Sequence, residues 1–414
     1  MRIKKAIPVS VALAILLFIL PILGAGCDFV TEKVVPIITS PETNKSLSSN
    51  TAVSSNPDGK LPPEFDILAE AWKQLSEDYV DKSKLDPQKL SQGAVKGMIE
   101  ALDDPYSGYV DPKTKELEMS TFEGKFEGIG AVISMKDKQL TVVAPIADSP
   151  AEKAGIKAGD KILEIDGQPT SKLGLIEATL KIRGSKDTSV RLLILHEGEA
   201  EPVEVQIVRS EIKVESVSFE MRGDIAYIRI TQFLKSTGGE LQDVLKDAIG
   251  KGAKGIVLDL RNNPGGLLNA SADVASQFLA MGLVAKVVDD EGRESQVPVK
   301  RGGIATHLPL IVLVNQGSAS ASEIVAGALQ DYGRAKLAGG QTFGKGSVQL
   351  VRDLSDGSAL HITAYRWLTP FGRPIDGVGL TPDFPLKLED EELVDWAIDY
   401  LKGQIKAELL PAFC

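Results

Sequence analysis

The stretch LIVLVNQGSASASEIVAGALQDYGRAKLAGGQTFGKGSVQ, residues 310–349, decides the fold of this chain. Its first six residues form a short apolar run of the kind that makes a fully buried strand. The QGSAS segment that follows has the composition of a tight turn, and the next eleven residues place Ile324, Ala328 and Leu329 at helical spacing. SVQLV at 347–351 predicts another strand. Alternating strands and helices of this kind are typical of an α/β core.

Ser320 lies at the junction between this turn and the predicted helix. The free backbone N–H groups and the dipole of a helix N-terminus favour negative charge. That position suits a nucleophile whose attack creates an oxyanion. However, Ser320-Ala321-Ser322-Glu323 is also a capping-box pattern, in which the serine would only cap the helix. The local pattern alone favours the cap, because such sequences begin many ordinary helices.

Lys345 lies between two glycines, in a chain that has no obvious histidine to serve as a base. Burial in an apolar site would lower the affinity of this lysine for a proton, so that it could act as a base. The segment from Gly339 to Lys345 also fits the G-x-x-x-x-G-K pattern of a phosphate-binding loop. That motif needs Ser or Thr next and then a helix, whereas here Gly346 and a predicted strand follow. We therefore reject the nucleotide-binding interpretation.

Three segments of the chain resemble the carboxy-terminal processing proteases, also called tail-specific proteases. They are NQGSASASEIVAGALQDYGRAKLAGGQTFGKGSVQ at 315–349, LRNNPGG at 260–266 and AYRWLTPFGRPIDGVGLTP at 364–382. In total the resemblance covers roughly residues 63–400. It implies a serine endopeptidase that needs no cofactor. The implied fold is α/β with mixed α+β parts: a ClpP/crotonase-like catalytic core with an inserted PDZ domain and an N-terminal helical segment.

The resemblance also assigns roles to individual residues. Ser320 would be the nucleophile, Lys345 the general base and Gln349 the residue that orients the lysine, while the amides of Gly266 and Ala321 would form the oxyanion hole. A free lysine, with a pKa of about 10.4, is almost never a base at neutral pH, but desolvation can lower that value by about 3–5 units. An uncharged glutamine can position the lysine without raising its pKa. On a strand the two side chains would share a face, because they are an even number of residues apart.

The histidines and cysteines are few. We interpret His196, His307 and His361 as structural residues, because no Ser-x-x-His geometry is implied for any of them. Nothing in the chain resembles a zinc-ligand set, so we expect no metal site. Two cysteines, Cys27 and Cys414, lie near the chain ends. A disulfide could join them, whereas lipidation of Cys27 would leave Cys414 as an odd thiol.

The N-terminus has the layout of an export signal. Arg2, Lys4 and Lys5 precede an uncharged stretch at 6–26, which is also long enough to span a membrane. LGAG before Cys27 resembles a bacterial lipoprotein cleavage site, although the leucine lies four residues before the cysteine where three is preferred. Lipidation of Cys27, an uncleaved membrane anchor and a plain signal peptide stay open as alternatives. All three place the protein outside the cytoplasm, either tethered to the cell membrane or exported.

The rest of the chain divides into segments of different composition. We predict a signal or anchor at 1–27, a flexible tether at 28–62, a helical segment at 63–120, a PDZ domain at 121–210 and a serine peptidase core at 211–414. The tether is rich in Ser, Thr, Asn and Pro, and has no core of its own. Two apolar stripes in the helical segment indicate a helical cap on the core. The resemblance implies an added role for this segment in a homodimer.

Residues 121–210 resemble a PDZ domain, which binds the carboxylate at the end of a peptide. We expect the carboxylate-binding loop to consist of Gly128, Ile129, Gly130 and Ala131. The helix expected at 175–182 would line the peptide groove. By resemblance Arg183 would couple the domain to the core, although a surface cation at a helix C-terminus is the alternative. The partners implied are protein substrates with apolar C-termini.

Composition and the intact motifs exclude other functions. The net charge of −11 argues against a nucleic-acid partner, which would need a basic surface. A non-catalytic PDZ scaffold would be expected to lack Ser320 or Lys345, and both are present. A crotonase-like acyl-transfer enzyme would lack the PDZ module and the export signal. Signalling cleavage, protein maturation and protein turnover stay open as roles for a protease.

Overall fold

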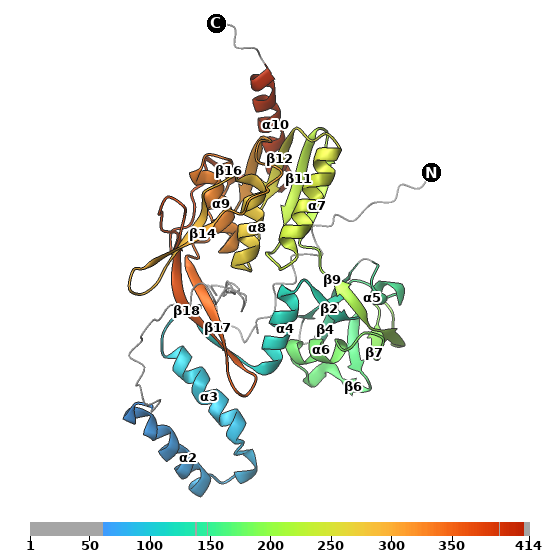
Figure 1. The fold of residues 1–414 in the computed structure, drawn as a ribbon. Helices are drawn as coiled ribbons and strands as arrows, with labels where there is room; N and C mark the ends of the chain where they lie inside the picture. The colour runs from blue at the N-terminus through green and yellow to red at the C-terminus, as the bar shows by residue number, and fades with distance from the viewer. Residues whose placement is uncertain (1–60, 137–138, 147, 389, 410–414) are drawn as a thin grey trace.

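The computed structural model describes residues 61–136, 139–146, 148–388 and 390–409. The predicted signal segment, nearly all of the predicted tether and both cysteines lie outside these residues. Figure 1 shows a large α/β unit, a smaller β-rich unit and a helical arm, connected by a long two-stranded ribbon and a short helix. None of the helices in the described ranges has the length and apolar character that a membrane crossing needs.

The α/β unit is built on a six-stranded sheet in the order β10-β11-β12-β15-β16-β19. Its strands are β10 (Val217–Arg222), β11 (Ile225–Ile230), β12 (Gly255–Asp259), β15 (Leu310–Val314), β16 (Lys336–Gly339) and β19 (Phe384–Pro385). The pairs from β11 to β19 are parallel, whereas β10 pairs antiparallel with β11. Strands β12 and β15 are buried along their whole length, as continuous apolar runs predict for a sheet covered on both faces.

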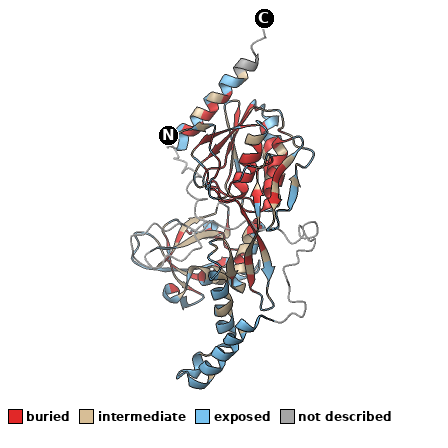
Figure 2. Cartoon of the chain, turned by 90° about the vertical axis from the view of Figure 1, so that its left-hand side faces the viewer, coloured by how far each residue is buried: buried red, intermediate tan, exposed pale blue. Residues whose placement is uncertain are grey.

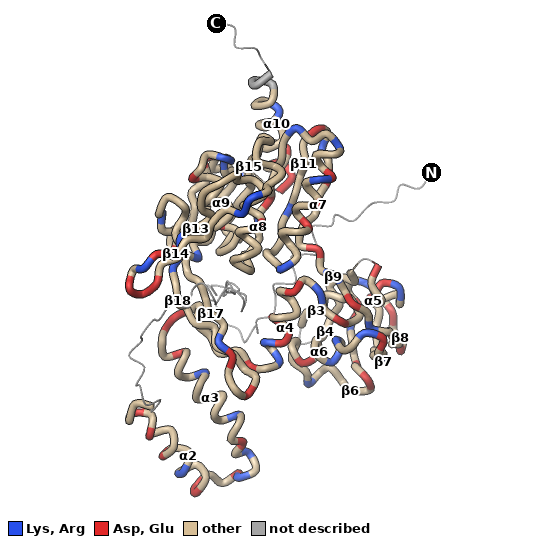
Figure 3. The backbone as a smooth tube through the Cα atoms, viewed as in Figure 1, with Lys and Arg blue, Asp and Glu red and all other residues tan. Residues whose placement is uncertain are grey.

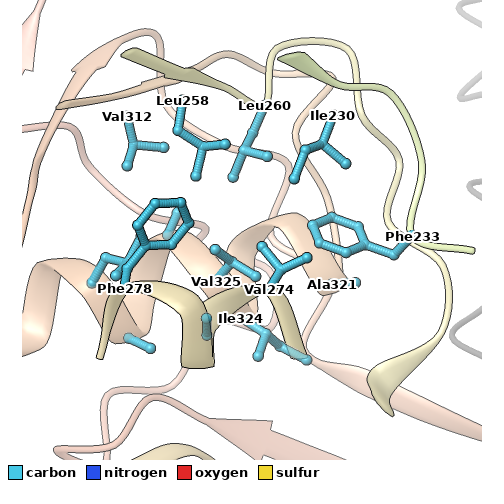
Figure 4. Packing of buried hydrophobic residues seen from close by; sticks show 14 of the residues in the cluster. Ile230, Phe233, Leu258, Leu260, Val274, Phe278, Val312, Ala321, Ile324 and Val325 are labelled. Carbon is cyan, nitrogen blue, oxygen red and sulfur yellow. The ribbon is translucent and has the colours of Figure 1, made fainter. Parts of the chain in front are cut away.

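Helices cover both faces of this sheet. They are α7 (Thr237–Gly250), α8 (Leu268–Phe278) and α9 (Ala321–Asp331) on one face, and α10 (Asp390–Leu409) on the other. Alternate residues of β15 point to opposite faces of the sheet. Val312 packs in the cluster with α8 and α9, whereas Ile311 and Leu313 pack with α10. Figure 4 shows the first cluster, in which Val274 of α8 and Val325 of α9 lie against the strands. The helix and strand expected at 321–331 and 310–315 are thereby confirmed.

A second, five-stranded sheet extends from this unit. Its order is β1-β18-β13-β14, and β17 also pairs with β18. The strands are β1 (Gly108–Val110), β13 (Leu283–Val288), β14 (Glu294–Pro298), β17 (Ser347–Asp353) and β18 (Ala359–Leu368). Strands β17 and β18 form the long ribbon in Figure 1. Because β1 pairs with β18, the residues just after the helical arm lie alongside the strands that follow Lys345.

The smaller unit lies at residues 131–208. Its strands are β3 (Ala131–Lys136), β4 (Gln139–Pro145), β5 (Lys161–Ile165), β6 (Gln168–Pro169), β7 (Ser189–Leu195) and β8 (Val203–Val208), with helices α5 (Pro150–Lys153) and α6 (Leu175–Ile182) and the 3₁₀ turn η5 (Thr170–Lys172). It has a hydrophobic cluster of its own, which includes Ile162, Ala178 and Val190. The paired strands β2 (Lys125–Gly128) and β9 (Ser210–Lys213) carry the chain into and out of the unit.

The helical arm stands away from the rest of the molecule. It contains η3 (Pro63–Phe65), α2 (Asp66–Asp78), η4 (Lys82–Lys84) and α3 (Pro87–Glu100), and α4 (Pro112–Phe122) follows β1. Neither α2 nor α3 has a buried residue, as Figure 2 shows in pale blue. Charged residues of both signs lie along the two helices in Figure 3, yet Leu68, Trp72 and Leu75 are 40–45% exposed. The prediction that these helices cap the core is therefore wrong, because their apolar stripes face no part of the described chain closely enough to be buried.

Candidate active site

Ser320 immediately precedes α9, and its side chain is fully buried. Its backbone has φ 59° and ψ −114°, a conformation that costs a non-glycine residue about 1–3 kcal/mol. The Oγ atom has no hydrogen-bond partner among the described residues. Ser320 and Glu323 are arranged as in a capping box, and the Glu323 carboxylate accepts the Ser320 amide at 2.8 Å. The hydroxyl itself makes no hydrogen bond to a described residue, so this arrangement does not occupy it.

The buried Glu323 carboxylate connects the serine turn to the lysine loop. Its Oε2 accepts the amides of Ser320 at 2.8 Å and Lys345 at 2.9 Å. Its Oε1 accepts the Gly344 amide at 2.7 Å and the Thr342 hydroxyl at 2.6 Å. Burial raises the pKa of this carboxyl, and the four hydrogen bonds oppose that rise. Sequence reasoning identified Glu323 only as a capping partner and missed its link to the lysine, because the two segments meet only in the folded chain.

Lys345 is fully buried, although it carries an ionisable amine. Burial lowers its pKa to about 7, while the carboxylates of Asp104 and Glu323 act in the opposite direction. The Nζ atom lies 4.9 Å from the centre of the Tyr106 ring. The Lys345 carbonyl accepts a hydrogen bond of 2.8 Å from the Trp367 indole, which ties the loop to β18. Near neutral pH a substantial fraction of this amine is therefore uncharged and able to accept a proton.

Gln349 lies on β17 and is also fully buried. Its Nε2 donates to the hydroxyls of Ser347 at 3.0 Å and Thr363 at 3.1 Å. Its Oε1 is buried and has no hydrogen-bond partner within the described residues. A buried acceptor normally has a donor, so this oxygen is suited to an N–H group that the site brings near it. That arrangement fits the predicted role of orienting an amine.

The turn after β12 approaches the serine closely. A Cβ atom on Gly265 would lie 2.8 Å from the Ser320 Cβ and 2.9 Å from the Ala321 nitrogen, so only glycine permits this approach. Gly266, with φ 142°, has room for no Cβ either, because one would lie 2.2 Å from the Phe233 carbonyl oxygen. The amides of Gly266 and Ala321 donate to no acceptor within the described residues. Two free N–H groups beside a serine are what an oxyanion hole requires.

Asn263 holds this turn in place, and sequence reasoning gave it no role. Its Oδ1 accepts the Gly265 amide and its Nδ2 donates to the Ile230 carbonyl, each at 2.9 Å. Its own carbonyl accepts the Ala319 amide at 3.0 Å and the Ser322 hydroxyl at 2.8 Å. The side chain is fully buried. Asn263 therefore connects β11, the glycine turn and the serine turn, so that the serine and the free amides keep one geometry.

The predicted carboxylate-binding loop lies between β2 and β3. Ile129 is buried, and its carbonyl accepts the Ala151 amide at 2.8 Å. A Cβ on Gly130, whose φ is 75°, would lie 2.4 Å from the Ser149 Cβ. These contacts hold the segment Gly128, Ile129, Gly130 and Ala131 against the start of α5, next to the end of α6.

Arg183 immediately follows α6 and is partly buried. Its guanidinium carbon lies 4.2 Å from the centre of the Phe126 ring, and it hydrogen-bonds to the Ser120 side chain of α4. Burial lowers its pKa to about 10. The alternative of a surface cation is wrong, because the side chain packs against β2 and α4. These contacts are with the segment that connects the two units rather than with the α/β core.

The histidines make contacts elsewhere. His196 Nδ1 lies 2.9 Å from Asp160 Oδ1, and His361 Nε2 lies 3.3 Å from Glu118 Oε2. All three histidines are described, and none is a hydrogen-bond partner of Ser320 Oγ. Within the described ranges no group of three His, Cys, Asp or Glu side chains could hold a metal ion.

Comparisons with known proteins match all three parts of the chain. The model of peptidase family S41 matches residues 224–386, that of the PDZ domain matches 141–195, and that of the activating protease CtpB N-terminal domain matches 21–114. The carboxy-terminal-processing protease of Bartonella bacilliformis is 44% identical over 307 residues, which cover 72% of this chain and 70% of that protein. The carboxy-terminal processing protease CtpA of Bacillus subtilis is 40% identical over 327 residues, covering 79% and 70%.

Among solved structures, the photosystem II D1 C-terminal processing protease matches with 32% sequence identity. The match covers 81% of this chain and 97% of that one, with a TM-score of 0.49.

Proposed function

This chain belongs to peptidase family S41, the carboxy-terminal processing serine proteases with a PDZ domain, and we propose that it is an exported endopeptidase with a Ser/Lys mechanism. In this proposal the PDZ domain binds the C-terminal tail of a protein, and the α/β core hydrolyses a peptide bond near that tail. The proposed mechanism rests on the properties of two buried side chains, Ser320 and Lys345. Ser320 has a hydroxyl without a hydrogen-bond partner among the described residues, and Lys345 has a pKa near 7.

The proposed reaction proceeds in two halves. The uncharged Lys345 amine takes the proton of the Ser320 hydroxyl as Oγ attacks the scissile carbonyl carbon. The amides of Gly266 and Ala321 bind the resulting oxyanion, and each such donor is typically worth about 10²–10³ in turnover. Lys345 then gives its proton to the leaving amine, which departs as the acyl-enzyme forms. In the second half a water molecule loses a proton to the lysine and attacks the ester carbonyl carbon. The bond to Ser320 Oγ then breaks, the lysine returns the proton to that oxygen, and the new carboxyl terminus is released. Gln349 Oε1 orients the amine throughout.

The proposed substrates are proteins with apolar C-termini. The loop from Gly128 to Ala131 presents successive backbone amides, which can bind a terminal carboxylate. The surface beside α6 would take the apolar side chains of the tail. We keep Arg183 as the proposed coupling residue, since its contacts with Phe126 and Ser120 join α6 to the segments that lead into the core.

Export and membrane attachment stay proposals that rest on the N-terminal sequence. The basic residues followed by an uncharged stretch favour an extracytoplasmic enzyme, with Cys27 as the proposed lipidation site. A homodimer is also proposed. The exposed apolar residues of α2 and α3 support it, because a second copy would remove them from water.

The proposal is tested with an unfolded reporter protein that ends in an apolar tail, beside a copy that ends in Asp-Asp. Purified full-length chain is compared with Ser320→Ala and Lys345→Ala. We expect the wild-type chain to cleave the apolar-tailed reporter, the Asp-Asp copy to be cleaved much more slowly, and both variants to be inactive. Normal cleavage by Ser320→Ala would contradict the assignment of the nucleophile. Binding of the tail without cleavage by any form would indicate a scaffold.

A further inference from the structure

The segment that connects the helical arm to the core enters the active site. After α3 the chain passes through Asp104, Tyr106 and Ser107, and then pairs as β1 with β18. The register places Gly108 opposite His361, two residues before Thr363. This segment lies more than 200 residues before Lys345 in the sequence.

Tyr106 is a direct neighbour of the proposed base. The Lys345 Nζ atom lies 4.9 Å from the centre of the Tyr106 ring, within the range of about 6 Å in which an ammonium interacts with an aromatic face. The ring also forms part of the wall of an open pocket of about 370 Å³, together with Ser347, Thr363 and Asp376. The ring therefore contributes both to that pocket and to the surroundings of the lysine.

A chain of hydrogen bonds connects the same segment to Gln349. The Asp104 carboxylate accepts the Ser107 hydroxyl at 2.6 Å and the Tyr106 amide at 3.0 Å. The Ser107 oxygen in turn accepts the Thr363 amide at 3.0 Å. The Thr363 hydroxyl then accepts the Gln349 side-chain amide at 3.1 Å. Gln349 is thus connected through Thr363 of β18 to Ser107, in addition to its hydrogen bond with Ser347 on its own strand.

We propose that Tyr106 and Ser107 are positioning residues of the active site, Tyr106 by covering the Lys345 amine and Ser107 by holding Thr363 against Gln349. This inference rests on the proposed Ser/Lys mechanism. If the inference holds, residues 104–107 belong to the active site together with the α/β core, although they precede the PDZ domain in the chain. Asp104 is the anchor of the segment, because its carboxylate accepts both the Tyr106 amide and the Ser107 hydroxyl.

Nearby charged groups and burial shift the pKa of Lys345 in opposite directions. Asp104 from the segment itself and Glu323 from α9 favour the ammonium form, and Asp376 lies near Tyr106, paired with Arg366 at 3.5 Å. Burial outweighs these carboxylates and lowers the Lys345 pKa. Removal of the Tyr106 ring would open the lysine to the adjacent pocket and to water. Loss of the ring face, which favours the ammonium, would act in the opposite direction, but desolvation is the larger effect at this fully buried amine. Rehydration would therefore raise the pKa of the amine toward its ordinary value.

The first test compares Tyr106→Ala with Tyr106→Phe in the full-length chain. Because the base must be uncharged, activity rises with pH through the lysine pKa. We expect Tyr106→Ala to move this rise in kcat to higher pH by roughly one unit, with activity that recovers in alkaline buffer. Tyr106→Phe keeps the ring and should keep the wild-type profile. An unchanged profile in Tyr106→Ala overturns the role of Tyr106, and so does a loss of activity that alkaline pH does not restore.

The second test compares Ser107→Ala with Ser91→Ala. The hydroxyl of Ser91 bonds only within exposed α3, to the Gln88 carbonyl at 2.9 Å, so it is a matched control. We expect Ser107→Ala to lower kcat about tenfold or more while KM stays near its wild-type value, because a misplaced catalytic group impairs chemistry rather than binding. Ser107→Thr, which retains the hydroxyl, should restore activity. An unchanged kcat overturns the role of Ser107.

These outcomes are distinguishable from failure of the proposed function. If Ser320→Ala retains activity, the Ser/Lys mechanism fails whatever the Tyr106 and Ser107 variants do. If Ser320→Ala and Lys345→Ala are inactive while Tyr106→Ala and Ser107→Ala behave as wild type, the mechanism stands and this inference fails. Thermal melting of each variant checks that the chain is folded.

Discussion

Helix α9 and the helices of the arm have similar patterns in the sequence but opposite environments in the structure. All three show apolar residues at helical spacing. Every residue of α9 from Ala321 to Leu329 is buried, whereas neither α2 nor α3 has a single buried residue. Periodicity thus predicts that a helix has an apolar face, but says nothing of what covers that face. The contrast between the buried α9 and the exposed arm can be measured with matched substitutions in each.

Among the matched pairs of variants, Glu323→Ala in α9 and Glu100→Ala in α3 should differ most, both in unfolding free energy and in activity. Glu323→Ala would leave four buried donors without their acceptor, at a cost on the order of 3 kcal/mol or more. It would also separate Ser320 from Lys345, so we expect activity to fall at least about 100-fold. Glu100 pairs with Lys96 at 3.8 Å on the surface, and Glu100→Ala should change neither property measurably. Denaturant unfolding and peptide cleavage measure both effects, and a mild phenotype for Glu323→Ala would contradict the role of this carboxylate.

The second largest difference, in unfolding free energy, is expected between Leu329→Ala in α9 and Leu75→Ala in α2. Leu329 is fully buried in α9, so its truncation should cost about 2–5 kcal/mol of unfolding free energy. Leu75 in α2 is 41% exposed, and its truncation should cost less than about 1 kcal/mol. The midpoints of urea unfolding at low protein concentration give the comparison. Equal losses would mean that the arm is packed in solution, and a loss for Leu75 that grows with protein concentration would identify a second copy as the packing partner.

The smallest difference is expected between Lys345→Met and Lys96→Met, in how the unfolding free energy changes with pH. Lys345 has a folded pKa of about 7 against an ordinary value of 10.5. Between these values the unfolded chain binds one more proton at this lysine than the folded chain, so the contribution of Lys345 to stability rises with pH across this window and is flat on either side. Lys345→Met removes this rise, and should be more stable than wild type at pH 7 by at least about 1 kcal/mol.

The exposed Lys96 provides the control for this measurement, since its side chain is 64% exposed. Lys96→Met should leave the wild-type rise between pH 7 and pH 10 unchanged. The unfolding free energy measured at several pH values tests both variants. Identical pH profiles for Lys345→Met and wild type would show that the lysine pays no desolvation cost in the folded chain.

Local patterns in the sequence predicted the elements on either side of Ser320 and Lys345. An unbroken apolar run predicts β15, and apolar residues at helical spacing predict α9. The glycines that follow α9 separate it from the predicted strand β17. The helix α6 also begins and ends at the expected residues, Leu175 and Ile182. These predictions depend on local patterns, because the period of apolar residues reflects the geometry of one element at a time.

The connections of the candidate site were harder to predict. The residues that resemble a family motif were found, but Glu323 was identified only as a cap and Asn263 was given no role. Tyr106 and Ser107 were not singled out at all. Each of these residues acts on a segment distant in the chain, as Tyr106 does on Lys345. No local period signals such a contact.

The sequence by itself therefore determined the helices, the strands and the family, because these depend on short patterns and on motif order. Only the tertiary structure decided which apolar faces are covered, that the Ser320 hydroxyl has no hydrogen-bond partner among the described residues, and that burial lowers the pKa of Lys345. The physical reason is that burial and the pKa are set by neighbours in space. For Lys345 those neighbours include Asp104 and Tyr106 from the segment before β1 and Glu323 from α9, which are two separate parts of the chain.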